Sequence, residues 1–304
     1  MQERSVLAYI FIVLKGMAMG AADVVPGVSG GTIAFISGIY EELITSINNI
    51  KPELFKIWKK EGFKQFWIKA NGNFLLALFS GIFISLFSLA TVVSWLLENE
   101  PVLLWSFFFG LVTASIFLVG KEISTWNIQA ILALLVGAIA AFYVTILPPN
   151  ENIESLPFLF VSGALAVCAM ILPGISGAFI LVILGSYKTI LAAVHERNLI
   201  IVATVGFGAI FGLLSFAKLL KYMFTHYKNV TLALLTGFII GSLNKIWPWK
   251  KIIEIKKFGD KEIIIDANTT PFSYDGDAQL IMAIGTAIIG FSLIFILERT
   301  AAKK

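Results

Sequence analysis

The chain has 304 residues, of which 58% are hydrophobic and only 14% are charged, and its mean hydropathy is +0.88. Soluble domains have about a quarter of their residues charged, so this composition excludes a water-soluble globular protein. The net charge of +4 comes from basic residues that flank apolar segments, which is typical of membrane orientation signals and does not indicate nucleic-acid binding.

Long apolar runs predict the membrane-spanning elements. Each run is close to the roughly 20 residues that cross a bilayer. In chain order they cover residues 74–97, 102–119, 128–147, 199–214, 230–243 and 278–297. We therefore predict an all-α polytopic membrane protein.

An internal repeat divides the chain into two copies of one unit. A Pro-Gly-x-Ser-Gly element recurs, followed in register by Gly and Tyr. The matched pairs are Pro26/Pro173, Gly27/Gly174, Ser29/Ser176, Gly30/Gly177, Gly38/Gly185 and Tyr40/Tyr187. A second match, residues 110–116 with 237–243, follows later in each half. We take residues 1–147 and 157–304 as the two copies.

Each copy is expected to hold one Pro-Gly-broken helical hairpin, at about residues 6–47 and 157–194, followed by three spans. An odd number of spans inverts the second copy relative to the first, and inverted-topology repeats are a common build of secondary transporters. A broken hairpin can re-enter on one side, giving six spans and two hairpins, or cross twice, giving ten spans. Both have the same parity, and the polar glycine-rich tips favour the re-entrant form.

Two connecting segments have patterns of their own. Residues 51–70 alternate lysines with aromatic residues, which predicts an amphipathic helix on the cytoplasmic membrane surface. Residues 250–278 alternate apolar and charged residues around a Gly-Asp pair, which predicts a β-hairpin. Parity places this second loop outside the cell, although it carries lysines, and places both chain termini in the cytoplasm. We expect a multi-pass protein of the inner (plasma) membrane.

The Pro-Gly elements predict an anion site. Proline lacks the amide proton that a helix uses and glycine permits irregular backbone, so each element breaks its helix. The helix that starts after the break directs its free amides, with a partial positive charge, at the break. The candidate residues are Gly27, Ser29, Gly30, Gly31, Thr32, Gly174, Ser176 and Gly177, with Pro26 and Pro173 as the helix-breaking residues. The alternative is that these glycines are helix-packing surfaces.

Three ionisable residues near the first element are candidates for transport. Asp23 would bind a coupling proton or cation, because a charge inside a membrane is costly and by default functional, or it would cap the following helix. Lys15 would pair with Asp23, attract a phosphate, or extend to the cytoplasmic surface. Glu41, at the end of the hairpin, is an interfacial residue and a weaker candidate. The second copy has Met170 in place of Asp23.

The sequence lacks the motifs of several enzyme classes. There is no Walker-type phosphate loop, and the two histidines, His195 and His226, lie in predicted loops. We predict no metal, no cofactor and no catalytic residue. An intramembrane lipid-pyrophosphate phosphatase remains an alternative, but its chemistry needs an arginine near the motifs, and none is there. A small-anion transporter or channel is the other alternative.

Three segments resemble a bacterial and archaeal membrane family, long called a domain of unknown function and associated with undecaprenyl-phosphate translocation. Residues 15–32 read Lys-Gly-Met-Ala-Met-Gly-Ala-Ala-Asp-Val-Val-Pro-Gly-Val-Ser-Gly-Gly-Thr. Residues 172–177 read Leu-Pro-Gly-Ile-Ser-Gly, and residues 241–249 read Gly-Ser-Leu-Asn-Lys-Ile-Trp-Pro-Trp.

The resemblance implies a flippase that returns polyprenyl phosphate from the outer to the cytoplasmic leaflet, coupled to protons or cations. That activity would recycle the lipid carrier of cell-wall synthesis. The anion site would then bind the phosphate of this lipid, and the partners would be the polyprenyl phosphate and membrane lipids. An oligomer is possible.

Overall fold

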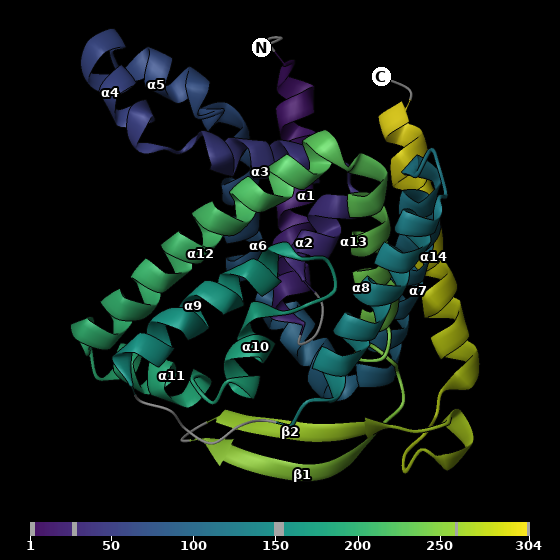
Figure 1. Ribbon diagram of the computed structural model, residues 1–304. Helices are drawn as coiled ribbons and strands as arrows, with labels where there is room; N and C mark the ends of the chain where they lie inside the picture. Colours follow the sequence, from purple (N-terminus) through teal and green to yellow (C-terminus); the bar gives the residue numbers. More distant parts are fainter. Residues whose placement is uncertain (1–3, 26–28, 149–154, 259–260, 303–304) are drawn as a thin grey trace.

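The computed structural model describes residues 4–25, 29–148, 155–258 and 261–302. The chain forms a bundle of helices with a two-stranded sheet at one end and both termini at the other (Figure 1). The first half contains α1 Val6–Val24, α2 Gly30–Ile36, α3 Tyr40–Asn49, α4 Pro52–Glu61, α5 Phe63–Lys69, α6 Gly72–Asn99, α7 Pro101–Glu122 and α8 Ile128–Ile146. The second half contains α9 Leu156–Ile171, α10 Gly177–Ile183, α11 Tyr187–His195, α12 Leu199–His226, α13 Lys228–Ser242, β1 Lys250–Phe258, β2 Lys261–Asn268, η1 Pro271–Ser273 and α14 Leu280–Ala302.

The described helices include five that are long and apolar enough to cross a membrane, namely α1, α6, α7, α8 and α12. Two short helices, α10 and α11, form a further apolar pair bent by 108° at the break between them. The outward side chains of the long helices are large and apolar: Ile139 on α8 and Phe207 and Phe211 on α12 are each at least 60% exposed. Such a surface requires lipid rather than water around it. The predicted all-α polytopic membrane fold is confirmed.

Helices pack in parallel pairs through reciprocal glycines. In the α7–α14 pair, a side chain at Gly110 would overlap the backbone oxygen of Ala287, and one at Gly290 would overlap that of Phe107. The α1–α6, α9–α12 and α8–α13 pairs make the same kind of contact. Because lipid provides no hydrophobic drive between helices, close backbone approach at small residues is what stabilises such pairs.

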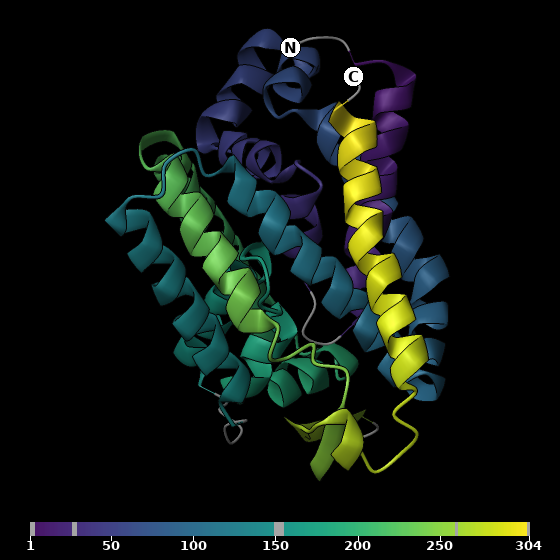
Figure 2. The ribbon, with the colours of Figure 1, turned by 90° about the vertical axis from the view of Figure 1, so that its right-hand side faces the viewer.

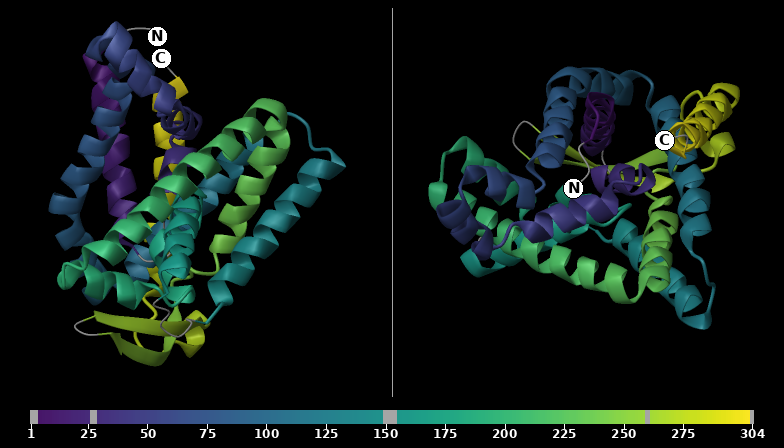
Figure 3. Two further views of the ribbon diagram at one scale, coloured as in Figure 1. Left: turned by 60° about the vertical axis from the view of Figure 1, so that its left-hand side comes forward. Right: turned by 90° about the horizontal axis from the view of Figure 1, so that it is seen from above.

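The two halves share their element order and exchange partners. In each half the first helix packs on a later long helix of the same half: α1 packs on α6, and α9 packs on α12. The last helix of each half packs instead on the other half, so that α8 lies against α13 and α14 against α7 (Figure 3). Figures 1 and 2 show α14 rising from the sheet end to the terminal end, whereas α8 runs the opposite way. These opposite directions agree with the inverted copies at residues 1–147 and 157–304, which remain a prediction.

The surface segment at residues 51–70 is not one helix as expected, but two. α4 ends and α5 begins at Gly62, whose φ of +84° a side-chain-bearing residue would rarely adopt. The break folds α5 back on α4, so that the rings of Trp58, Phe63 and Phe66 contact one another. Phe55, Trp58 and Phe63 are exposed. An aromatic face among lysines fits the expected position on the membrane surface.

In the segment where the sequence predicts a β-hairpin, β1 and β2 pair in antiparallel register from Lys250 with Asn268 to Phe258 with Lys261. Two indole groups attach this hairpin to its flanking segments. Trp247 donates to the Thr269 carbonyl at 2.8 Å, and Trp249 donates to the Ala278 carbonyl at 2.9 Å. The hairpin therefore lies in a fixed position across the sheet end of the bundle.

The glycine contacts predict a difference between two positions on α7. Gly110→Ala should lower the free energy of unfolding by about 1–3 kcal/mol, the cost of overpacking a close contact. Gly120→Ala meets no atom within 4 Å and should be neutral or slightly stabilising, because alanine favours a helix by roughly 0.5–1 kcal/mol. The melting temperatures of both variants in detergent micelles measure this; equal shifts would contradict the packing account.

Candidate functional site

The two Pro-Gly elements meet inside the bundle. The first lies between α1 and α2, and its Pro26 and Gly27 are outside the described residues. The second lies between α9 and α10, where Gly174 has a φ of +86° directly after Pro173. Both helices break where the sequence predicts, and α2 packs against the end of α9.

Among the described residues, three hydrogen bonds join the two elements. The Ser29 hydroxyl donates to the Met170 carbonyl at 3.1 Å, and the Tyr40 hydroxyl donates to the Ile171 carbonyl at 3.1 Å. In the other direction, the Gly174 amide donates to the Thr32 hydroxyl oxygen at 2.8 Å. The last carbonyls of a helix lack intrahelical partners, and in a membrane they must find partners within the protein. The first element therefore satisfies the broken end of the second.

The amides at the start of α2 are already bound by groups of the protein. The Asp23 carboxylate accepts from the Gly30 amide at 2.7 Å, and the Ser29 hydroxyl accepts from the Gly31 amide at 3.1 Å. Ser29 is 1% exposed and is the N-cap of α2. The expected anion site at this helix start stays a prediction, because in this structure the Asp23 carboxylate and the Ser29 hydroxyl bind these amides. Asp23 has the capping geometry that was one of its two expected roles.

The glycines of the first element bring backbones together. A Cβ at Gly30 would lie 2.6 Å from an Asp23 carboxylate oxygen, and one at Gly31 would lie 2.7 Å from the carbonyl oxygens of Met170 and Ile171. Gly31 therefore has the packing role that was the alternative to ligand binding. Gly30 keeps the carboxylate close to the helix start.

The second element differs from the first. Ser176 is the N-cap of α10, but its side chain makes no capping hydrogen bond. Position 170 has a methionine, so no carboxylate reaches the start of α10 from that position. Gly177 is packed, since a Cβ there would lie 2.6 Å from the Ala166 carbonyl oxygen. Phe179 stands in place of Thr32. Among the described residues, side chains cap the start of α2 but not that of α10.

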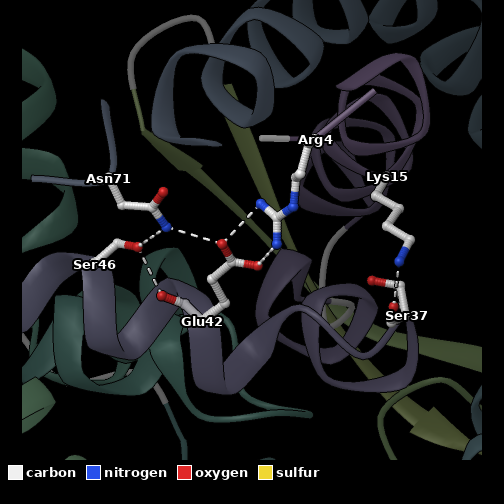
Figure 4. Close-up of polar contacts among 6 residues, drawn as sticks. All are labelled: Arg4, Lys15, Ser37, Glu42, Ser46 and Asn71. Atoms are coloured by element: carbon white, nitrogen blue, oxygen red, sulfur yellow. Dashed lines mark hydrogen bonds and ion pairs between the residues drawn. The ribbon is translucent and has the colours of Figure 1, made fainter. Parts of the chain in front are cut away.

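The other two transport candidates lie away from this crossing. Lys15 donates to the Ser37 carbonyl at 2.6 Å, at the far end of α2 (Figure 4). Lys15 and Asp23, both on α1, therefore bind the two ends of α2. Glu41 forms a 3.2 Å ion pair with Lys228, and both side chains are more than half exposed. Glu41 thus lies in an exposed ion pair, and its interfacial position stays a prediction.

A polar cluster at the terminal end was missed by the sequence analysis. Glu42 accepts two hydrogen bonds from the Arg4 guanidinium, at 2.8 and 2.7 Å, and a third from Asn71 at 2.8 Å (Figure 4). Asn71 donates to the Ser46 hydroxyl at 3.0 Å, and Glu42, Ser46 and Asn71 line a pocket of about 470 Å³. The cluster ties the chain start, α3 and the start of α6 together. No periodic signal in the sequence joins residues 4, 42 and 71.

Within the described residues, no three His, Cys, Asp or Glu side chains are placed to hold a metal ion.

Comparison with known proteins identifies the family. Residues 19–262 match the VCA0040-like family, described as undecaprenyl phosphate translocase-like. The chain belongs to this family. A polyprenyl-phosphate transporter of Vibrio cholerae is 42% identical over 97% of this chain and 98% of its own length. A polyprenyl-phosphate transporter of Staphylococcus aureus is 32% identical over 78% of this chain and 85% of its own. Both relatives are named as transporters and not as enzymes. No solved structure matches the chain.

The two elements of the repeat provide a matched test of the crossing. Tyr40→Phe should lower the free energy of unfolding by about 1–3 kcal/mol, because it leaves a buried carbonyl without its donor. Tyr187 has the corresponding position in the second element, and its hydroxyl makes no hydrogen bond among the described residues. Tyr187→Phe should therefore change the free energy of unfolding by at most about 0.5 kcal/mol. Thermal unfolding in detergent compares them; a Tyr187 effect as large as that of Tyr40 would contradict the crossing.

Proposed function

We propose that this protein is a flippase that moves polyprenyl phosphate from the outer leaflet to the cytoplasmic leaflet of the inner (plasma) membrane. Family membership and the names of the two relatives support the substrate. The lipid-facing helices support a path in which the prenyl chain stays in lipid while the headgroup passes through the protein. The crossing of the two broken elements is the observation that carries the proposal.

The crossing is suited to a moving part. Backbone groups are irregular there, which a membrane protein tolerates only where they are buried in protein or line a cavity. The elements are joined through single hydrogen bonds from Ser29, Thr32 and Tyr40, each worth about 1 kcal/mol. Such contacts hold one arrangement and can be exchanged for another. In inverted-repeat transporters, substrate sites lie at this kind of junction.

Asp23 supplies a means of coupling. Its carboxylate holds the Gly30 amide, which is the donor that a phosphate oxygen would use. A neutral carboxyl group competes less well for that amide than a carboxylate. Protonation of Asp23 would therefore release the amide to the phosphate, and departure of the phosphate would favour loss of the proton. Because Lys15 holds the other end of α2, α1 and α2 would move as one unit.

The orientation follows from the position of the lysines. Both termini lie at the same end of the bundle as α4 and α5 (Figure 1). These two helices, with the residue that precedes α4, carry six lysines: Lys51, Lys56, Lys59, Lys60, Lys64 and Lys69. Excess lysine marks the cytoplasmic side, so we place the termini in the cytoplasm and the β-hairpin outside.

Transport in proteoliposomes tests the coupling residue. Asp23→Asn leaves a neutral group that cannot lose a proton, so no carboxylate returns to the Gly30 amide to displace the phosphate, an exchange worth about 1.5–3 kcal/mol. Translocation of fluorescent polyprenyl phosphate should therefore slow roughly tenfold or more. The remaining rate should no longer respond to a pH gradient. Glu41→Gln is the control, since an exposed ion pair contributes about 0–1 kcal/mol, and its rate should stay within about twofold.

Other outcomes separate the alternatives. Release of free phosphate by the intact protein would identify a phosphatase. Movement of small anions without movement of the lipid would leave an anion transporter. Transport by Asp23→Asn with an intact response to the pH gradient would remove Asp23 from the coupling mechanism while leaving the flippase.

A further inference from the structure

Two lysines and one carboxylate meet at the sheet end of the molecule. Lys245, in the segment after α13, lies 3.2 Å from one Asp266 carboxylate oxygen. Lys250, at the start of β1, lies 3.6 Å from the other. The three side chains are between 11% and 19% exposed, so the cluster is largely withdrawn from solvent without being sealed.

Aromatic rings flank both lysines. The Lys250 ammonium lies 3.7 Å from the ring centre of Trp105 on α7, and the Lys245 ammonium lies 5.1 Å from that of Phe179 on α10. Contacts of this kind hold a cation at a ring face. The indole hydrogen bonds of Trp247 and Trp249 fix the segment between the two lysines. Both ammonium groups are therefore held in place before any ligand arrives.

The charges of this cluster do not balance. Among the described side chains, Asp266 is the one carboxylate within 4 Å of either ammonium, so two cations share one anion. Burying a cation without a counter-ion is costly. A second anion bound between the lysines would complete the pairing, and a phosphate group has enough oxygens to accept from both ammonium groups.

The cluster lies at the second broken element. Phe179, which Lys245 contacts, is in the first turn of α10, three residues after Ser176. No described side chain caps this element, whereas the Asp23 carboxylate occupies the first. The β-hairpin lies directly below α10 in Figure 1, at the end opposite the termini. An anion held by the lysines would thus lie at the entrance to the uncapped element.

We propose that Lys245 and Lys250 form a binding site for a phosphate monoester, where the lipid headgroup docks from the outer leaflet before it enters the second broken element. In this site Asp266 occupies part of the position that the phosphate takes. The inference rests on the proposed function, because it assigns the place where the substrate is first held.

The site has a distinctive pH dependence. Burial, the largest cause, lowers the pKa of Lys250 to about 8; Asp266 opposes this shift and Lys245 adds to it. These are the charged groups that face Lys250 among the described side chains. Lys250 is charged below that pH and becomes neutral above it. Phosphate binding should therefore weaken as the pH rises from 7 to 9.

Binding to the full-length protein in detergent micelles tests the site, with farnesyl phosphate, inorganic phosphate and farnesol as probes. Lys245→Gln and Lys250→Gln should each weaken farnesyl phosphate binding roughly tenfold to a hundredfold, the effect of a lost hydrogen bond to a charged group. Asp266→Asn should strengthen it, because it removes the competing carboxylate. Lys251→Gln is the matched control: Lys251 is the next residue on β1, and its pair with Asp275 is exposed. Its affinity should stay within about twofold of the intact protein.

The Asp266 variant separates a binding site from a structural ion pair. If Asp266→Asn weakens binding as much as the lysine variants do, or if the lysine variants bind normally with unchanged melting temperatures, the site is overturned. Binding of inorganic phosphate as tight as that of farnesyl phosphate would overturn the lipid headgroup as its ligand. Lysine-dependent binding without translocation in proteoliposomes would keep the site and reject the flippase. If both lysine variants translocate the lipid at the rate of the intact protein, the flippase is kept and the site is rejected.

Discussion

Hydrogen bonds between two broken helices are the constraint on which this structure depends. A membrane protein that interrupts a helix leaves backbone carbonyls and amides that lipid cannot satisfy. Here the end of α9 is satisfied by the hydroxyls of Ser29 and Tyr40 from the other half of the chain. The amide of Gly174 is satisfied by Thr32. Neither break would be stable alone, so the two elements require each other and must meet inside the bundle.

The helices around this crossing are arranged to bring the halves together. Reciprocal glycines let paired helices approach until their backbones touch, and α8 and α14 each pack on a helix of the opposite half. This exchange prevents the halves from separating as two independent domains. Motion between them is then restricted to small displacements of packed elements, and the single hydrogen bonds of the crossing are the contacts that such a displacement would exchange.

The two broken elements differ in the charges around them. In the first, Asp23 caps α2 with a carboxylate and Lys15 binds its other end. In the second, a methionine stands in place of the acid, and Phe179 in the first turn of α10 contacts Lys245. One element thus carries its own anion, and the other lies beside unbalanced positive charge. This difference in charge gives the surroundings of the two broken elements different chemistry.

The sequence by itself determined the membrane class, the helix breaks and the candidate residues of the first element, because apolar length, proline and glycine act locally. It also indicated that the copies differ, since Asp23 has no acidic counterpart. Only the tertiary structure decided that Gly31 packs against the α9 carbonyls, that Asp23 already occupies the α2 amides, and that Lys245 and Lys250 share Asp266. The Gly31 contact joins residues far apart in the chain, as does the nearby bond between Ser29 and Met170, which are 141 positions apart. No local pattern encodes which backbone group a side chain will meet once the helices have packed.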